Sequence, residues 1–307
     1  MNGAWCIWLL GLLFLLLPLS GLSAPWPGVE DARGNVLQLK TPARRIVSLS
    51  PHLTELLFSA GAGGRIVGAV AYSDYPPAAR RIPRVGDAFR LDLERILALE
   101  PDLVVAWRSG IKTADLERFS ALGIPLYVVD STSLDGIAAE LLDLGQLAGT
   151  APSARQAASR YREKFAALTG RYGGREKVTV FYQLWDHPLM TVSGRHVIGE
   201  VIRRCGGRNP FAGLTPLAPT VAMEAVLAAD PQVMIAAEAT GTADVFSLWR
   251  GQRALRAVRA NRLYTLPGDW ISRPSLRILQ GMERICAILE EVRQGLGDGK
   301  TATTPAR

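Results

Sequence analysis

The feature that most constrains the fold of this chain is an internal repeat. Residues 93–106 align without a gap to residues 223–236, and each segment runs from a helical pattern through an acidic residue and a proline into an apolar strand. Helix and strand patterns that alternate along a chain are typical of α/β folds with a parallel sheet. The repeat therefore predicts two similar Rossmann-like α/β lobes.

One long helix is expected between the two halves. Residues 151–172 contain proline only near their start and are rich in Ala, Arg, Gln and Lys, a composition that favours an uninterrupted helix. We therefore expect one long rigid helix to join the lobes. The expected organisation is an N-terminal lobe over residues 24–150, a connecting helix over 151–173, a C-terminal lobe over 174–295 and a flexible polar tail over 296–307. Because open α/β sheets bind ligands beyond the carboxyl ends of their strands, two facing lobes predict a cleft between them.

The N-terminus is typical of an export signal. Residues 1–28 carry no charged side chain, and Ile7 to Leu19 form an apolar block rich in leucine. We expect a signal peptide over residues 1–23, cleaved near Ser23, and a periplasmic protein. The basic residues usual at the start of a signal are absent, so an uncleaved anchor is the alternative. Cys6 precedes the apolar block, so we expect no lipid attachment.

The cysteines favour a disulfide over a metal site. Removal of the signal would leave Cys205 and Cys286 in an oxidising compartment, where an even number of cysteines suggests a bridge. Two separate buried thiols are the alternative. No pair of cysteines has the C-x-x-C spacing of a structural zinc site, and the three histidines are far apart along the chain, so no bound metal is expected.

Composition and motifs argue against nucleic-acid binding and catalysis. The net charge is +7, but the 35 basic residues are scattered rather than clustered, so no nucleic-acid partner is expected. The chain has no G-x-S-x-G nucleophile motif and no phosphate-binding loop. An envelope hydrolase or chelatase that used His52 and Asp130 is the catalytic alternative. For His52, His187 and His196 themselves we expect polar surface positions.

Aromatic side chains lie at the ends of predicted strands. Tyr72, Tyr75, Trp107, Trp185 and Trp270 each end or closely follow such a strand. Aromatic faces at the carboxyl edges of two sheets would bury a large flat ligand in the cleft. Core packing is the alternative for any one of them.

Several segments carry a resemblance to a known family. RRIVSLSPHLTELLFSAG resembles the periplasmic receptors for iron complexes and corrinoids, in which a rigid helix joins two lobes. AYSDYPPAARRIPRVG, LERILALEPDLVVAWRSG, GIPLYVVDSTS, CGGRNPF and GDWISRPSLRI look like the cobalamin-binding members of that family, which serve an ABC importer. The likeness runs from about Arg44 to Leu289.

The resemblance implies a receptor without catalytic activity. Such a receptor would capture cobalamin (vitamin B12) in the cleft and deliver it to the membrane permease subunits of an ABC importer. The resemblance also matches Cys205 and Cys286 to the two cysteines of the family's disulfide. It also implies that Glu94 and Glu224, which are equivalent in the repeat, dock onto arginines of the permease. The expected ligand-binding residues are Tyr72, Phe89, Trp107, Trp185, Met190, Asp269, Trp270 and Arg273.

Two positions depart from the pattern of the cobalamin receptors. Pocket tryptophans expected by the resemblance fall on Ala88 and Ala218. Either Phe89 and Trp185 fill the same volume, or the ligand is a related corrinoid such as cobinamide. A haem or ferric-siderophore receptor is a further alternative, since a siderophore would favour an arginine-rich cleft and haem an axial Tyr or His. In each case the metal belongs to the transported ligand, and the protein is expected to need no cofactor.

Overall fold

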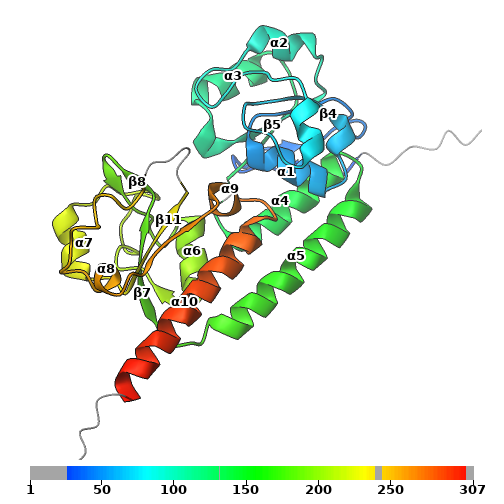
Figure 1. Ribbon diagram of the computed structural model, residues 1–307. Helices are drawn as coiled ribbons and strands as arrows, with labels where there is room; N and C mark the ends of the chain where they lie inside the picture. The colour runs from blue at the N-terminus through cyan, green and yellow to red at the C-terminus, as the bar shows by residue number, and fades with distance from the viewer. Residues whose placement is uncertain (1–25, 131, 239–243, 302–307) are drawn as a thin grey trace, which may run out of the picture.

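The computed structural model describes residues 26–130, 132–238 and 244–301. Figure 1 shows two α/β lobes connected on one side by the long helix α5 (Ala151–Tyr172), as the sequence predicts. The expected signal peptide over residues 1–23 lies outside the described residues. Within the described part of the chain, no helix is both long enough and apolar enough to cross a membrane.

The N-terminal lobe is built on a parallel four-stranded sheet with the order β4-β3-β5-β6. Its strands are mostly apolar because a parallel sheet covered by helices is buried on both faces. The strands are β3 (Ile46–Ser48), β4 (Ile66–Ala69), β5 (Leu103–Trp107) and β6 (Leu126–Val129), preceded by the hairpin β1 (Val29–Glu30) and β2 (Val36–Leu37). The helices are α1 (Pro51–Ser59), α2 (Leu93–Ala98), α3 (Thr113–Ala121) and α4 (Leu134–Leu147), with the 3-10 turns η1 (Gly63–Arg65), η2 (Pro77–Arg81) and η3 (Arg108–Gly110).

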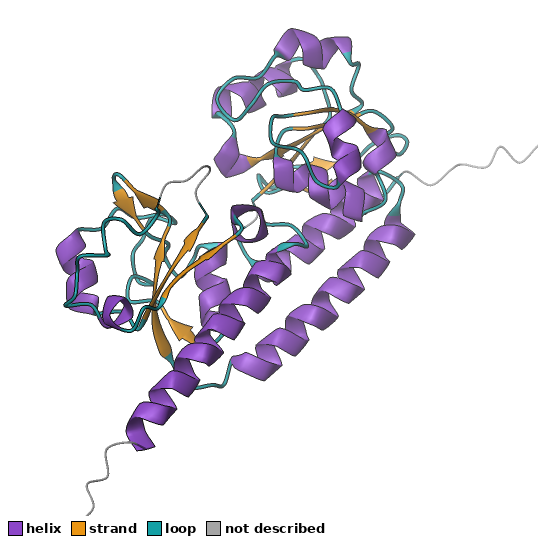
Figure 2. Cartoon of the chain, in the orientation of Figure 1, coloured by secondary structure: helices purple, strands orange, loops and turns teal. Residues whose placement is uncertain are grey.

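The C-terminal lobe repeats this topology, with a parallel sheet in the order β10-β7-β11-β12. In both lobes the second strand of the sheet lies at an edge beside the first, and the third and fourth lie on the other side (Figure 2). The strands are β7 (Val178–Gln183), β10 (Gly207–Arg208), β11 (Val233–Ala237) and β12 (Leu263–Leu266), with the antiparallel hairpin β8 (Trp185–Asp186) and β9 (Leu189–Met190). The helices are α6 (Val197–Arg204), α7 (Met223–Ala229), α8 (Arg256–Arg259), α9 (Gly268–Ile271) and α10 (Ile278–Thr301).

The sequence repeat occupies equivalent places in the two sheets. It forms α2 followed by β5 in the first lobe and α7 followed by β11 in the second. The polar residue just before each third strand also makes the same contact with the backbone at the start of the first strand. Asp102 Oδ1 accepts a hydrogen bond from the N–H of Arg45 (2.9 Å), and Gln232 Oε1 accepts one from the N–H of Thr179 (2.7 Å). The prediction of two similar α/β lobes is confirmed.

The last helix and its disulfide complete the second lobe. Cys205, at the end of α6, is bonded to Cys286 on α10, so the expected disulfide is present. Helix α10 continues to Thr301, and its residue Leu296 packs against the main hydrophobic core. The expectation of a flexible tail from residue 296 is therefore wrong as far as Thr301, while residues 302–307 lie outside the described part.

Candidate functional site

A cavity of about 50 Å³ lies between the lobes. Strands β3 to β6 and β7, β11 and β12 all end on the side where the lobes face each other (Figure 1). Both lobes contribute to the lining, so the cleft predicted from the repeat exists. The lining residues are Trp107, Ser109 and Thr132 from the first lobe and His196, Val197, Leu217, Ser272 and Pro274 from the second.

Trp107 lies at the floor of this cleft as the last residue of β5. The indole Nε1 atom is buried, and within the described part of the chain it has no hydrogen-bond partner. The ring of His52 meets the indole edge-on, with ring centres 5.3 Å apart. A buried N–H donor beside a cavity is available to an acceptor on a ligand, because leaving such a group unpaired costs free energy.

His52 is buried, so the expected surface position is wrong for this residue. It belongs to α1, whose apolar residues pack into the core, and its Nδ1 atom lies 2.7 Å from the hydroxyl of Ser50. Burial, with the charge of Arg273 as a second cause, lowers the pKa of His52 to about 3. His196 is mostly buried as well, and burial lowers its pKa to about 4. His187 is exposed, as expected.

An ion-pair cluster crosses the cleft at Arg273. Its Nη1 atom donates to Glu55 (3.0 Å) and to Asp74 (2.9 Å) of the first lobe, and its Nη2 atom pairs with Asp269 (2.9 Å) of the second. The structure thus brings together Asp269 and Arg273, two of the expected ligand-binding residues. Burial opposes ionisation of Asp74, but the hydrogen bond and charge of Arg273 outweigh it and lower the pKa of this carboxyl.

Arg277 binds the same buried carboxylate. Its Nε and Nη2 atoms donate to the two oxygens of Glu55 at 2.9 and 2.5 Å, and its guanidinium lies 4.0 Å above the ring of Tyr75. Burial disfavours the charged form of Arg277, but the contacts with Glu55 outweigh this and raise its pKa. Neither Glu55 nor Arg277 is among the residues expected from the sequence. The available signal was an acidic residue within the apolar run of α1, together with two arginines four residues apart after α9.

Three of the expected aromatic residues are largely exposed. Tyr72 is 76% exposed, Phe89 83% and Trp185 61%. Phe89 lies in a tight turn in which Asp87 Oδ1 accepts hydrogen bonds from the N–H groups of Phe89 (2.8 Å) and Arg90 (2.9 Å). These rings are therefore available to a ligand. Their contact with one remains a prediction.

The other expected ligand residues lie on short elements after the strands. Trp185 and Met190 are cross-strand neighbours in the hairpin of β8 and β9. Trp270 lies in α9, directly after β12, and is partly buried. Trp185 thus follows β7 and Trp270 follows β12, as expected from the sequence.

The two residues of the hydrolase alternative do not contact each other, and no metal site is found among the described residues. His52 contacts Ser50 and Trp107, whereas Asp130 forms an ion pair with Arg108, so the two residues of the hydrolase alternative have different partners. In residues 26–130, 132–238 and 244–301, no group of three or more His, Cys, Asp or Glu side chains is placed to hold a metal ion.

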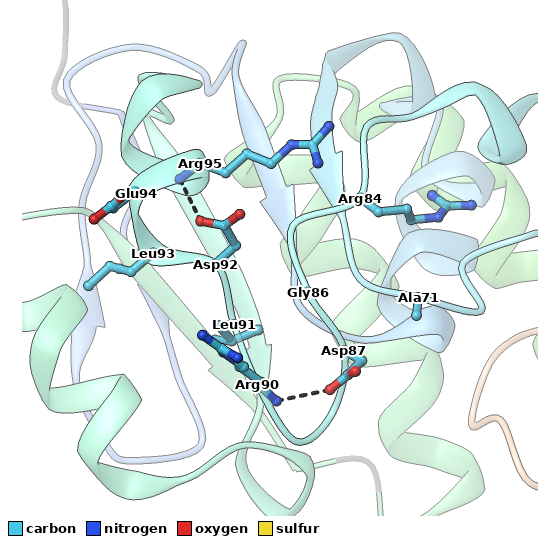
Figure 3. Close-up of a pocket in the computed structure, with 10 residues that line it drawn as sticks. All are labelled: Ala71, Arg84, Gly86, Asp87, Arg90, Leu91, Asp92, Leu93, Glu94 and Arg95. Atoms are coloured by element: carbon cyan, nitrogen blue, oxygen red, sulfur yellow. Dashed lines mark hydrogen bonds between the residues drawn. The ribbon is translucent and has the colours of Figure 1, made fainter.

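Glu94 and Glu224 occupy the same position in the two lobes. Each lies exposed in the first turn of its helix, α2 or α7. Figure 1 shows these helices at the outer ends of the lobes, away from α5. Glu94 also borders a surface hollow of about 730 Å³ whose lining comes from the first lobe alone, including Arg84, Arg90 and Arg95 (Figure 3).

Comparison with known proteins gives relatives along most of the chain. A vitamin B12-binding protein of Vibrio campbellii is 36% identical over 254 residues, which cover 82% of this chain and 92% of the relative. One from Yersinia pestis is 37% identical over 245 residues, which cover 80% of this chain and 85% of the relative.

Solved structures show the same likeness. The crystal structure of the periplasmic vitamin B12-binding protein of Vibrio cholerae has a TM-score of 0.76 and 34% identity, covering 82% of this chain and 98% of that one. A periplasmic heme-binding protein from Roseiflexus sp. has a TM-score of 0.72 at 24% identity, covering 81% and 99%, and shows the shared fold alone. The family model for periplasmic binding proteins matches residues 46–270. This chain, with its two repeated lobes and the cleft between them, belongs to the periplasmic binding protein family.

Proposed function

We propose that this protein is a receptor that binds cobalamin in the interlobe cleft and delivers it to an ABC importer, without catalysing a reaction. The observation that carries the proposal is the cleft itself, which is lined by Trp107 of one lobe and by Ser272 and Pro274 of the other. Ser272 and Pro274 flank Arg273 in the sequence. Relatives at 34–37% identity are named vitamin B12-binding proteins, which supports this choice of ligand.

The chemistry of the cleft suits a corrin. A corrin ring is broad and flat and carries amide side chains around its edge. Exposed rings such as Tyr72 and Trp185 offer apolar faces to the macrocycle, and burial of such surface is favourable. Carboxylates and guanidiniums at the Arg273 cluster can accept from and donate to the amides. Ala88 and Ala218 in place of bulkier residues leave room that Phe89 can fill from the adjacent turn.

We further propose that the protein acts in the periplasm after removal of residues 1–23. The uncharged, leucine-rich start of the chain supports export, and the disulfide between Cys205 and Cys286 suits an oxidising compartment. Mass measurement of protein recovered from the periplasm would identify the first residue. A mass that includes residues 1–23 would contradict cleavage.

Docking onto the importer is assigned to Glu94 and Glu224. Both are exposed, both begin a helix at the outer end of a lobe, and the two lobes have the same topology. An importer with two equivalent permease subunits would present two equivalent basic patches, one for each lobe. Pairing between a carboxylate and arginine is strongest when it is bidentate and partly desolvated.

Calorimetric titration tests the choice of ligand. Cyanocobalamin, cobinamide, haem and a ferric siderophore would each be titrated into the purified protein without added metal ions. We expect one-to-one binding of a corrinoid. The proposal fails if neither corrinoid produces heat at concentrations up to about 100 μM, far above the dissociation constant expected of a scavenging receptor. Binding of haem or the siderophore alone would assign the cleft to that ligand instead.

A further inference from the structure

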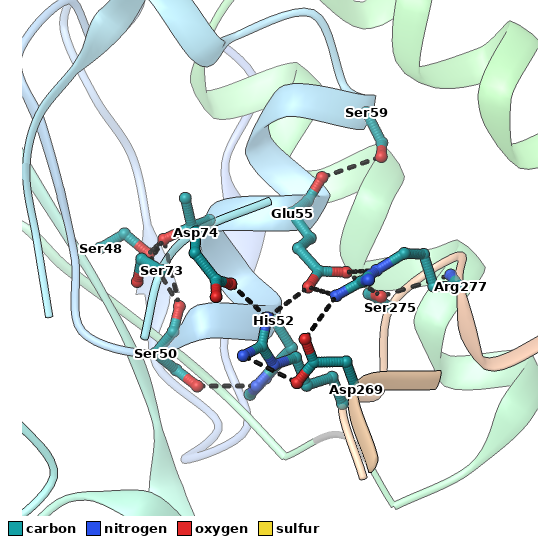
Figure 4. Close-up of polar contacts among 12 residues, drawn as sticks. Ser48, Ser50, His52, Glu55, Ser59, Ser73, Asp74, Asp269, Ser275 and Arg277 are labelled. Carbon is teal, nitrogen blue, oxygen red and sulfur yellow. Dashed lines mark hydrogen bonds and ion pairs between the residues drawn. The ribbon is translucent and has the colours of Figure 1, made fainter. Parts of the chain in front are cut away.

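A buried carboxylate of the first lobe is held by side chains of the second. Glu55, on α1, is only 2% exposed. Besides its contacts with the guanidiniums of Arg273 and Arg277, it accepts a hydrogen bond from the hydroxyl of Ser275 at 2.6 Å (Figure 4). A carboxylate taken out of water is stable only where charges and hydrogen bonds replace its hydration. Here that replacement exists only while the two lobes are in contact.

The cluster around Glu55 fixes Arg273 at the cleft. The Arg273 side chain is 13% exposed, whereas its other partners Asp74 and Asp269 are 43% and 46% exposed. Ion pairs with exposed carboxylates are weak because solvent competes for both charges, so the buried Glu55 is the firmest of the three anchors. Without the charge of Glu55, Arg273 would be held only by the two carboxylates that solvent reaches.

We infer that Glu55 is a positioning residue of the binding site, which holds Arg273 of the opposite lobe in the orientation that the ligand meets. The inference rests on the proposed function, because it assigns Glu55 an effect on corrinoid binding that passes through Arg273. Glu55 itself lies behind the guanidiniums and is not expected to touch the ligand. A residue that prepares its neighbours in this way raises affinity by reducing the ordering cost of binding.

A second interlobe carboxylate provides the matched comparison. Glu200, on α6 of the second lobe, is also buried, and its Oε2 atom accepts a hydrogen bond from the N–H of Leu134 at the start of α4 (2.8 Å). Its Oε1 atom pairs with Arg204 of its own helix (3.0 Å). Glu200 therefore joins the lobes as Glu55 does, but its partners are Leu134, Arg203 and Arg204 and not Arg273. A general weakening of the lobe contact would appear with either residue, whereas loss of Arg273 positioning would appear with Glu55 alone.

A double-mutant cycle tests the inference. Glu55→Gln and Glu200→Gln would each be made in the wild-type and in an Arg273→Ala background, and cyanocobalamin affinity would be measured by calorimetry. Glu55→Gln keeps the shape of the side chain and removes its charge. We expect it to raise the dissociation constant about tenfold in the wild-type background and less than twofold with Arg273→Ala, because its effect passes through Arg273. Glu200→Gln should have the same effect in both backgrounds.

The outcomes separate this inference from the proposed function. Equal losses for Glu55→Gln in the two backgrounds, or no loss in either, would overturn the positioning role while wild-type binding still supported a corrinoid receptor. Failure of the wild-type protein to bind any corrinoid would overturn both. Folding would be checked by thermal melting of each variant. If Glu55→Gln does not fold, Ser275→Ala serves instead, since it removes one hydrogen bond to Glu55 and no charge, and we expect about a threefold loss that also disappears with Arg273→Ala.

Discussion

The expected ligand residues and the residues around Arg273 include exposed rings and buried polar groups. Tyr72, Phe89 and Trp185 leave most of their surface in solvent, although burying them would be favourable. His52 and Glu55 are buried although their burial is costly. Exposed aromatic surface and buried charge both cost free energy in a protein without its ligand. The buried groups contact Trp107 and Arg273 at the junction of the two lobes.

Replacement of Trp107 tests the floor of the cleft. Trp107→Ala should weaken cyanocobalamin binding by about 1 to 3 kcal/mol, because the ligand loses an apolar surface and the buried Nε1 donor. Trp107→Phe should lose less. Trp26→Ala is the control, since its indole donates to the carbonyl of Gln146 and does not line the cavity. Calorimetry measures all three, and unchanged affinity in Trp107→Ala would place this residue outside the binding surface.

The buried histidines predict loss of stability in acid. The folded-state pKa values of His52 and His196 lie below the usual 6.5, so below that pH the unfolded chain binds more protons than the folded one. The free energy of unfolding should therefore be level above about pH 7 and fall as the pH drops below 6.5, by up to about 2 kcal/mol per histidine between pH 7 and 5.

Urea unfolding at pH 7 and pH 5 measures this difference. His52→Asn should remove about half of the loss between the two pH values, because one of the two buried imidazoles no longer titrates. His187→Asn, at an exposed position, should leave the loss unchanged. If all three proteins lose the same free energy, burial of His52 does not govern the pH dependence.

At the level of elements, the repeat predicted the architecture because each copy contains a complete helix–turn–strand unit. Residues 93–106 and 223–236 contain the helix, the turn and the strand in one continuous stretch, and the turns have the same backbone form. Glu100 and Asp230, each just before a proline, both adopt positive φ, of 44° and 38°. Because the residue before proline is kept from a right-handed helical conformation, the helix ends there in both lobes.

The end of the last helix was harder to predict from sequence. Residues 297–301 are polar or glycine, a composition that favours disorder. Helix α10 nevertheless continues to Thr301, and Leu296 packs against the core that α10 shares with the rest of the lobe. The helix thus continues past the point at which local composition would end it.

The disulfide gives a prediction for the elements that it joins. It links the end of α6 to α10 across a sequence separation of 81 residues. Replacing Cys205 and Cys286 with alanine should lower the free energy of unfolding by about 4 to 5 kcal/mol, since the bridge restricts a long loop in the unfolded chain. Denaturant unfolding measures this loss, and a reducing agent should destabilise the wild-type protein but not the variant. Alkylation of both residues in denatured, unreduced protein would show that the bridge does not form.

At the scale of the whole molecule, the contacts that cross the cleft were beyond prediction from sequence. The ion pair of Glu55 with Arg273 joins residues 218 positions apart. The spacing of apolar residues identifies α1 as a buried helix, but it does not predict that Glu55 faces the second lobe. The places of the expected aromatic residues were easier to predict, because strand ends are visible in the sequence and the carboxyl ends of parallel strands meet at one edge of a sheet. Their contact with a ligand stays a prediction, whereas the contacts that depend on how the lobes pack could not be predicted.

The arrangement of the lobes also predicts how the protein engages its importer. Glu94 and Glu224 lie on separate lobes, so a permease pair can contact both only if their spacing is fixed. Helix α5 and the cluster around Glu55 provide two connections that hold this spacing. Glu94→Ala combined with Glu224→Ala should therefore abolish cobalamin uptake and importer binding. Because both residues lie at the outer ends of the lobes, corrinoid affinity should stay within about twofold, a change below about 0.5 kcal/mol.

The loss of transport is measured as uptake of labelled cobalamin in cells that depend on this receptor. Corrinoid affinity is measured by calorimetry. Glu117→Ala with Glu283→Ala is the matched control, since it removes the same charge from exposed positions on α3 and α10 that the repeat does not relate. Loss of uptake in the control as well would assign the effect to net charge, which attracts basic surfaces without specific pairing. Normal transport by the Glu94 and Glu224 double variant would show that the importer recognises another surface. Parallel loss of ligand binding would place these carboxylates in the cleft rather than at the docking face.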